Sequence, residues 1–385
     1  MSERGPIAVT GMGMMTPVGL SVAASCAAFR AGITRLTPVF GKMLADDENQ
    51  PVPAAGGRVP LEWFTGGPIE DEYPGHEAWG LPIPPPSHAF VTPGAARLLE
   101  LAAPAAAEAW KQARLADRAP RPTGLYLGLD DADDARGLAD GLAEALHVSF
   151  AIERADKLGR AAALAALHRA IRHLREGRVE VALVGGVDSL VRPELIERLA
   201  GAGVLKSEDH PQGIAPGEAA AFLVLEAAPG AGTKPLAWIT GTGLAEEPSA
   251  GTDDANEGIG LTRALRAARE AAAGHQPEKF PRIVCDLNGD RYRAMEWAYA
   301  LIRALPDLKQ DKRGEVWGPE ETERWHPAEY IGDVGAASAI VNAAWAITAM
   351  RKGYARSDDV LLWGASNGSL RAAAFLTTHD PMKRS

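Results

Sequence analysis

Residues 159–171 read GRAAALAALHRAI and predict a helix of small residues that packs closely into a core. The pattern continues through RHLREG at 172–177 into VALVGGV at 181–187, a strongly apolar strand. Many α/β enzymes place a nucleophile where such a helix begins, because the helix dipole and the free backbone N–H groups stabilise negative charge there. The residue at that position is Arg160, which stays protonated at any working pH and cannot attack a substrate.

The composition is that of an ordinary globular protein. The chain has 385 residues, 46% hydrophobic and 23% charged, so it can bury a large core without a metal or a disulfide. Its net charge of −10 argues against general binding to nucleic acid or to an anionic membrane, which requires basic patches. No apolar stretch of the roughly 18 residues that span a membrane is free of charged or helix-breaking residues, and the N-terminus does not resemble a secretory signal.

The two cysteines, Cys26 and Cys285, indicate buried thiols rather than ligands. Neither stands in a CxxC or CxH spacing, so the sequence predicts no zinc site, and no motif requires another metal or a cofactor. Cys26 lies in an expected helix and Cys285 in an expected apolar strand, where a free thiol packs as a small hydrophobe. Unpaired thiols are typical of a reducing compartment, so we expect a cytoplasmic protein.

Strands and helices alternate along the chain, and the order restarts near its middle. This pattern predicts an α/β protein with a mostly parallel sheet, built from two related halves at 1–230 and 231–385. A Gly-rich turn is expected at 11–19 and an irregular insertion at about 40–90. Strands are expected at 6–9, 124–129, 148–152, 182–187, 220–226, 237–241, 283–287, 360–363 and 372–377, and helices at 22–31, 93–115, 260–273, 292–305 and 335–350.

Five segments, in this order, resemble β-ketoacyl synthases. They are IAVTGMGMMTPVG (7–19), AALHRAIRHLREGRVEVALVGGVDSL (165–190), GIAPGEAAAFLVLE (213–226), GAASAIVNAAWAITAM (335–350) and WGASNGSL (363–370). Each segment alone is weak, but together they span nearly the whole chain. The resemblance implies the thiolase fold, in which duplicated αβαβα halves stack into five layers. It also implies a dimer.

The resemblance implies four catalytic positions, and all of them are substituted. Counting back from Gly177 puts Arg160 where the family has its nucleophilic cysteine. Asn288 replaces the histidine of the family's His-Gly-Thr motif, and Gly332 or Asp333 replaces the second histidine. The family lysine corresponds to the region of Pro327, and its gatekeeper phenylalanine to Trp363.

The substituted positions could have one of two roles. Arg160 could bind an acidic ligand in a remodelled pocket, or it could form an ion pair with a nearby carboxylate such as Asp290 or Asp333. If the fold is right, the polar side chains should converge. The candidate pocket residues are Arg160, Asn288, Asp290, Asp333, Trp363 and Asn367.

Other polar residues of the sequence are also candidates for chemistry. His147, Ser149 and Asp156 lie near one another in the sequence, and a Ser-His-Asp set built from them stays open. His168, in the small-residue helix, is expected to be a hydrogen-bonded core histidine rather than a base.

The sequence therefore predicts a ketosynthase homologue without condensing activity, acting as a non-catalytic binding, adaptor or partner subunit. It would form a homodimer, or a heterodimer with a ketosynthase-like or other protein, and an acyl carrier protein is a candidate ligand. One alternative is an acyltransferase or hydrolase that uses a remodelled pocket. Another is a subunit like the chain length factors that work beside an active ketosynthase.

Overall fold

A computed structural model describes residues 5–40, 53–57, 59, 94–130, 135–206, 210–230, 233–272, 275, 281–305 and 324–381. Within these residues, ten strands form one sheet in the order β10-β9-β11-β12-β8-β1-β7-β6-β4-β5. A separate antiparallel pair is formed by β2 (Thr37–Phe40) and β3 (Pro53–Gly56).

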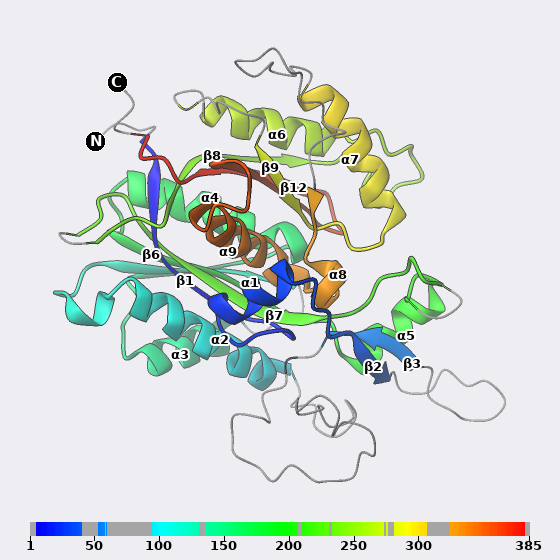
Figure 1. Ribbon diagram of the computed structural model, residues 1–385, viewed down its shortest axis with the longest axis horizontal. Coiled ribbons are helices and arrows are strands. Elements are labelled where there is room, and N and C mark those ends of the chain that lie inside the picture. Colours follow the sequence, from blue (N-terminus) through cyan, green and yellow to red (C-terminus); the bar gives the residue numbers. More distant parts are fainter. Residues whose placement is uncertain are drawn as a thin grey trace, which may run out of the picture.

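The ten strands divide into two sets of five with the same arrangement (Figure 1). In both sets the first two neighbouring pairs are parallel and the last two are antiparallel. The first set, in spatial order, is β5 (Ile152–Lys157), β4 (Thr123–Leu129), β6 (Val181–Ser189), β7 (Glu218–Glu226) and β1 (Ile7–Met15). The second is β10 (Arg324–Trp325), β9 (Arg282–Cys285), β11 (Asp359–Ala365), β12 (Leu370–Thr377) and β8 (Ala237–Glu246). The duplication predicted from element order is therefore present, and the domain boundary at 230 and 231 stays a prediction.

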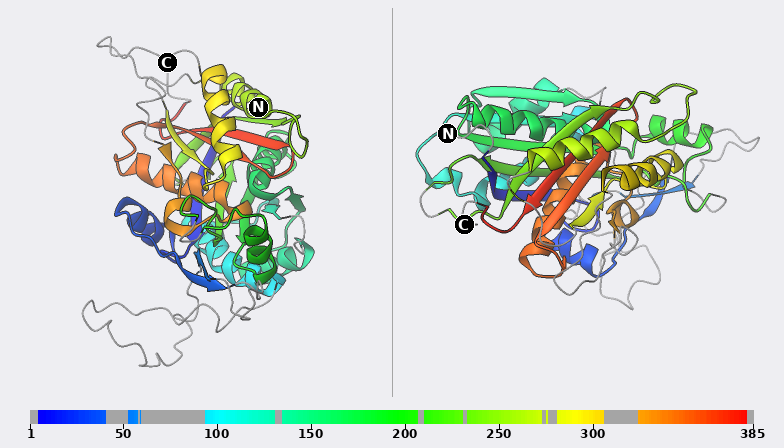
Figure 2. Two further views of the ribbon diagram at one scale, coloured as in Figure 1. Left: turned by 90° about the vertical axis from the view of Figure 1, so that its right-hand side faces the viewer. Right: turned by 90° about the horizontal axis from the view of Figure 1, so that it is seen from above.

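Helices complete the five layers that we expected. The middle layer consists of α4 (Ala162–Arg175) and α9 (Ser338–Arg351), which contact each other and strands of both sets. The outer layer of the first set is α2 (Gly94–Gln112) and α3 (Ala135–Leu146). That of the second set is α6 (Ile259–Ala271) and α7 (Arg291–Ala304), and the two outer layers lie on opposite sides of the molecule (Figure 2). Among the described helices, none is long and apolar enough to cross a membrane.

The sheet is mixed, whereas the alternation of strands and helices predicted a mostly parallel sheet. β11 passes to β12 through a short turn at 366–369, and a connection of that length joins antiparallel neighbours. β7 is likewise antiparallel to both of its neighbours, β6 and β1. β1 also pairs with β8, and this pairing joins the two sets into one sheet.

The glycines at the start of the chain serve helix packing rather than the predicted turn. β1 continues to Met15, so only the end of the segment 11–19 turns. A Cβ on Gly11 would lie 2.2 Å from the carbonyl oxygen of Ala109, and one on Gly13 would lie 1.8 Å from that of Ala105. Both alanines belong to α2, so the glycines let the helix backbone approach the strand closely.

Three local expectations also differ from the structure. The described part of the 40–90 insertion contains β3, and residues 60–93 lie outside the described residues. The strand expected at 148–152 is β5, which begins at Ile152, because the apolar residues precede an edge strand whose own side chains are mostly exposed. The short helices α1 (Val22–Arg30) and α8 (Ala328–Ile331) lie beside the central layer, and α5 (Pro193–Gly201) follows β6. Of these three helices, α8 and α5 were not predicted.

Candidate functional site

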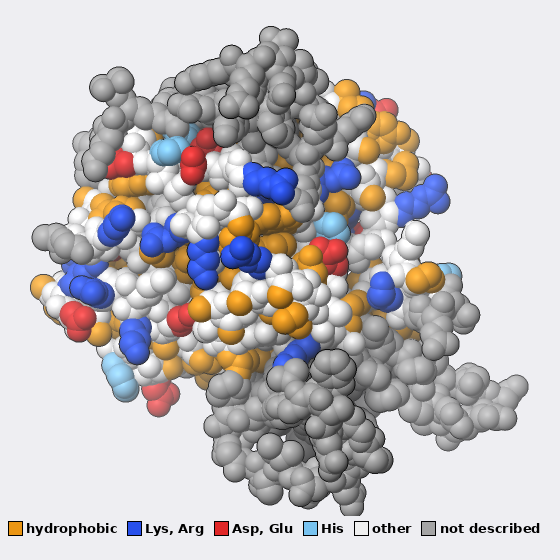
Figure 3. Space-filling model, viewed as in Figure 1, with side chains coloured by type: hydrophobic (Ala, Val, Ile, Leu, Met, Phe, Trp, Pro, Cys, Tyr) orange, Lys and Arg blue, Asp and Glu red, His pale blue; other side chains and the backbone are white. Residues whose placement is uncertain are grey.

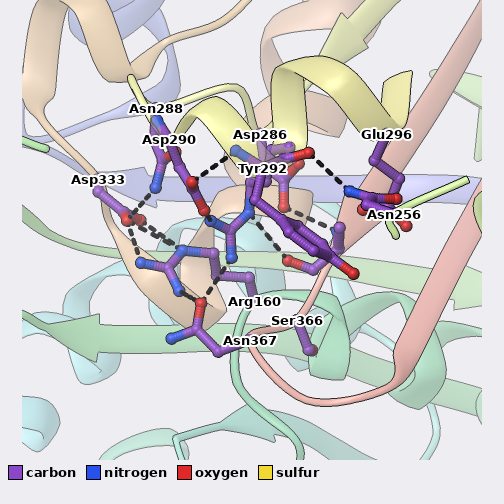
Figure 4. Close-up of polar contacts among 12 residues, drawn as sticks. Arg160, Asn256, Asp286, Asn288, Asp290, Tyr292, Glu296, Asp333, Ser366 and Asn367 are labelled. Atoms are coloured by element: carbon purple, nitrogen blue, oxygen red, sulfur yellow. Dashed lines mark hydrogen bonds and ion pairs between the residues drawn. The ribbon is translucent and has the colours of Figure 1, made fainter. Parts of the chain in front are cut away.

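Arg160 lies directly before α4, where the sequence placed it. It belongs to the 3-10 turn Gly159–Ala161, and Gly159 supplies the positive φ of 68° with which that turn begins. The Arg160 residue is only 8% exposed, and its guanidinium points toward side chains from two other segments (Figure 4). A cation is unfavourable at the positive end of a helix dipole, so this position needs a compensating carboxylate.

Asp333 supplies that carboxylate. Arg160 Nε lies 3.0 Å from Asp333 Oδ1 and 2.9 Å from Oδ2, and Nη2 also donates to Oδ2. The contact is a bidentate, charge-assisted pair, which is the strongest kind of hydrogen-bonded ion pair. Of the two partners considered for Arg160, the structure selects Asp333 and not Asp290.

Asp333 is fixed by its own backbone as well as by its side chain. Its N–H donates to the carbonyl of Ala215 at 2.7 Å, and its carbonyl accepts from Gly217 N–H at 2.7 Å. Its Oδ1 accepts from Gly335 N–H at 3.0 Å. The preceding residue, Gly332, has a φ of 75° and contributes no side chain, so Asp333 is the one of the two candidates that joins the cluster.

Asn288 and Asp290 link this cluster to the start of α7. Asn288 Nδ2 donates to Asp333 Oδ2 at 2.6 Å, and its Oδ1 accepts from Asp290 N–H at 3.1 Å. Asp290 caps α7 by accepting from Tyr292 N–H at 2.9 Å, and it pairs with Arg293 Nη1 at 2.7 Å. Asp290 therefore compensates Arg293, and its link to Arg160 is indirect.

The turn between β11 and β12 closes the cluster from the other side. Asn367 Oδ1 accepts from Arg160 Nη1 at 2.8 Å and from Arg293 Nη2 at 2.7 Å, so one amide oxygen bridges two guanidiniums. Ser366 Oγ accepts from Ala161 N–H at 3.1 Å and donates to the Leu158 carbonyl. The Ala161 N–H, which is one of the free donors of the helix start, is thus already bonded.

Trp363 does not join the cluster, although the sequence placed it among the candidate pocket residues. It is fully buried and stacks on Trp297 of α7, with ring centroids 5.1 Å apart and an interplanar angle of 12°. Both rings belong to the core between the second set of strands and α6 and α7. Side chains alternate between the two faces of a strand, and the sequence alone did not reveal which face of β11 carried Trp363.

Sequence reasoning missed two charged members of the site, Arg293 and Asp286. Arg293 is 2% exposed, and its Nε also donates to the Ala365 carbonyl at 3.2 Å. Asp286 follows β9 and accepts from Ala365 N–H at 2.9 Å through Oδ2. The spacing of Asp290 and Arg293, one helical turn apart, was a signal for the first of these; Asp286 has no comparable signal in the sequence.

The buried charges shift one another's protonation equilibria. Burial acts to raise the pKa of Asp333, but the Arg160 guanidinium outweighs burial and leaves that pKa below its ordinary value. Burial acts to lower the pKa of Arg160, and Asp333 reverses this, so the pKa ends above its ordinary value. Burial raises the pKa of Asp286 even though Arg293 opposes the shift. Arg160 and Asp333 are therefore both held in their charged forms.

The charged side chains of this cluster bind one another, and no cysteine thiol is among them. Of the described residues, Asp333 and Asn367 accept the hydrogen bonds of the Arg160 side chain. Burial raises the pKa of both Cys26 and Cys285 to about 12, so neither thiol forms a thiolate near neutral pH. In the described part of the chain, no group of three or more His, Cys, Asp or Glu side chains could hold a metal ion.

The other polar candidates have partners of their own. Asp156 is bound by Arg169 through contacts of 2.5 and 3.1 Å, so it does not orient His147 as a Ser-His-Asp set would require. His168 Nδ1 lies 2.8 Å from Thr242 Oγ1 on β8, and burial lowers the pKa of its imidazole. It is hydrogen-bonded, as expected, but half-buried rather than in the core.

Comparison with known proteins supports the resemblance. Residues 159–231 match the model of a family described as "Beta-ketoacyl synthase, N-terminal domain". A search of curated proteins found no match. The matched residues 159–231 span the Arg160 turn, α4, β6 and β7, and they include the small-residue helix.

Solved structures extend the likeness to the whole chain. "The ishigamide ketosynthase/chain length factor" is 21% identical, with a TM-score of 0.74 over 98% of this chain and 100% of that one. A type II PKS acyl-carrier protein in complex with its ketosynthase bound to the hexaketide gives 16% identity and 0.74 over the same shares. The ketosynthase from module 6 of the bacillaene synthase of Bacillus subtilis 168 gives 16% and 0.70, over 98% of this chain and 72% of that one. The fold is therefore the thiolase-like fold of the ketosynthases.

Proposed function

We propose that this chain is a β-ketoacyl-[acyl carrier protein] synthase homologue without condensing activity, which acts as a non-catalytic binding or partner subunit. The observation that carries the proposal is the buried ion pair of Arg160 and Asp333. The resemblance places Arg160 where the family has its nucleophilic cysteine, and Gly332 or Asp333 where it has its second catalytic histidine. An ion pair that satisfies both residues leaves neither group for acyl transfer.

The rest of the cluster supports the same conclusion. Condensation requires a thiolate at the helix start, free N–H donors for the oxyanion and groups that polarise the carboxylate of the extender unit. Asn288 carries an amide, which does not titrate, and its two polar atoms are bonded to Asp333 and Asp290. The N–H of Ala161 is bonded to Ser366. These contacts support the proposal that the chain lacks condensing activity.

The solved relatives suggest the kind of partner. Their titles name a ketosynthase/chain length factor and a ketosynthase in complex with an acyl-carrier protein. We infer that this chain pairs with a ketosynthase-like subunit or with a second copy of itself, and that an acyl carrier protein is a candidate ligand. A role like that of a chain length factor is the second candidate function, favoured by the likeness to the first of these structures.

Mass spectrometry of the purified protein tests the loss of chemistry. The protein is incubated with malonyl and acyl thioesters on coenzyme A and on a carrier protein, beside a ketosynthase that retains its cysteine. We expect neither a covalent adduct nor a condensation or decarboxylation product. Turnover would overturn the proposal. An acyl adduct mapped to one residue would instead support the acyltransferase or hydrolase alternative.

Light scattering and co-expression address the partner. A mass twice the chain's 40.6 kDa indicates a homodimer. Co-expression with a cysteine-containing ketosynthase separates the two candidate roles, because a chain-length-factor-like subunit should co-purify with it and change the length of its product. A chain that remains alone and leaves the product unchanged would contradict the second candidate.

A further inference from the structure

The outward face of α7 is apolar along its length. Met295, Tyr299 and Ile302 are 42%, 41% and 73% exposed, and their spacing of i, i+4 and i+7 puts them on one side of the helix. Ala294 and Ala298 are exposed beside them. Figure 3 shows hydrophobic side chains gathered on the upper right of the molecule, where Figure 1 places α7. We call these five residues the α7 stripe.

The opposite side of α7 is buried and includes the charged Arg293 and Glu296, so the exposed stripe is separate from the core face. Trp297, Ala300 and Ala304 are buried against the second set of strands and α6. A helix on the surface of a globular protein ordinarily carries one apolar face and one polar face. α7 instead turns an apolar face to the solvent and buries two charged residues, and a contiguous exposed apolar face is typical of a protein interaction site.

Cations lie at both ends of the α7 stripe. Arg291 precedes it and Arg303 follows it, and both are exposed. The Arg303 guanidinium lies 5.6 Å from the centre of the Tyr299 ring, so this charge is held against the stripe. The single acidic residue of α7, Glu296, is fully buried. The exposed surface of α7 is therefore apolar and cationic, although the whole chain has a net charge of −10.

We propose that the α7 stripe is a docking site for an acidic amphipathic helix of a partner protein. Arg291 and Arg303 are twelve residues apart, which is about 18 Å along a helix axis. A helix lying along α7 with apolar residues at i, i+3, i+4 and i+7 covers the stripe, and acidic residues at its two ends meet the arginines. A second copy of this chain fits less well, because antiparallel pairing of two α7 helices would bring guanidiniums of both copies to each end.

Two synthetic peptides test the proposal by fluorescence anisotropy. Both are alanine-based helices with the same leucine stripe; one carries glutamates about twelve residues apart, to span about 18 Å, and the other carries lysines there. We expect the glutamate peptide to bind the intact protein at least tenfold more tightly than the lysine peptide. Ile302→Glu should remove that binding, and the double variant Arg291→Glu/Arg303→Glu should reverse the preference between the peptides.

The control is Ile33→Glu, an equivalent change at a residue that is 49% exposed after α1; binding should be unchanged. Circular dichroism confirms that each variant is folded. Equal binding of the two peptides, or binding that survives Ile302→Glu, would overturn the proposal. A homodimer that Ile302→Glu converts to monomer would also overturn the proposal, because a second copy of the chain would then occupy the α7 stripe. Peptide binding that appears only after residues 306–323 are deleted would overturn it as well, since that segment of the chain would then be what occupies the α7 stripe.

Discussion

Removal of the Arg160 guanidinium should destabilise the protein far more than removal of a surface arginine. In Arg160→Met, Asp333 keeps the Asn288 amide and the Gly335 N–H as donors, and its buried carboxylate loses its ion-pair partner, with Arg293 as the remaining cation that acts on it. Breaking a buried pair from one side costs about 3–5 kcal/mol. The two remaining hydrogen bonds place the expected loss at the lower end, about 3 kcal/mol.

A double-mutant cycle separates the pair from the rest of the site. Asp333→Asn alone leaves the Arg160 cation with Asn367 as its partner, and it should cost a similar amount. In Arg160→Met/Asp333→Asn neither charge remains, so the two losses should not add, and the coupling free energy should be about 2 kcal/mol or more. Urea denaturation followed by circular dichroism measures all four proteins. The control is Arg172→Met, because the Arg172–Glu176 pair is exposed and is worth less than about 1 kcal/mol.

The difference in unfolding free energy between wild type and Arg160→Met should depend on pH, and the direction of that dependence follows from the pKa of Asp333. The pKa of Asp333 is below its ordinary value in the folded protein, so its contribution to stability is present above the unfolded pKa of about 3.9 and is lost as the pH falls through the folded value. The difference in stability between wild type and Arg160→Met should therefore narrow as the pH is lowered toward 4 and below. Additive losses in the cycle, a constant difference across pH, or a loss equal to that of Arg172→Met would each refute the reasoning.

Two further outcomes follow from packing and from burial of thiols. Gly13→Ala should lower the free energy of unfolding by about 2 kcal/mol or more, because its Cβ would overlap the α2 backbone; Gly201→Ala, with open space around its Cβ, should have no such effect in the same urea titration. The thiols of Cys26 and Cys285 should not react with iodoacetamide at pH 8 until urea unfolds the chain, since burial raises both pKa values to about 12. Labelling of the folded protein, read by mass spectrometry, would contradict this.

The sequence predicted the parts of the fold that rest on strong periodicity. The small-residue helix after Gly159 and the apolar strand β6 were found because close packing excludes large or polar side chains there. β5 was misplaced by several residues, because an exposed edge strand needs no apolar pattern. The antiparallel direction of β7 was not predicted either, since direction depends on how the chain returns to the sheet and not on the strand's own residues.

The candidate site was predicted only in part, because motif positions identify residues but do not give their contacts in space. Arg160, Asn288, Asp333 and Asn367 were found through motif positions, and the structure brings all four into one cluster. The choice of Asp333 over Asp290 as the ion-pair partner was open, because the two carboxylates belong to different segments and the sequence does not give the distance of either segment from Arg160. Trp363 was misassigned because a motif position does not state which face of the strand its side chain occupies.

The cluster also predicts that a cysteine introduced at position 160 alone would be a poor nucleophile. In Arg160→Cys the new thiol stands at a helix start, which by itself lowers a thiol pKa. The variant, however, leaves the Asp333 carboxylate beside it without Arg160, and a neighbouring negative charge disfavours a thiolate. We expect slow alkylation by iodoacetamide at pH 7 and a thiol pKa above the ordinary value of about 8.5.

The double variant Arg160→Cys/Asp333→Asn should react faster at the same pH, since the carboxylate is gone and the helix start remains. The two native thiols are buried, so the adduct can be mapped to residue 160 by peptide mass spectrometry. If both variants alkylate at the same rate, Asp333 does not control the charge at the helix start. A faster double variant would mean that the charge at the helix start depends on the ion-pair partner as well as on residue 160, so that a reactive thiol there requires both substitutions.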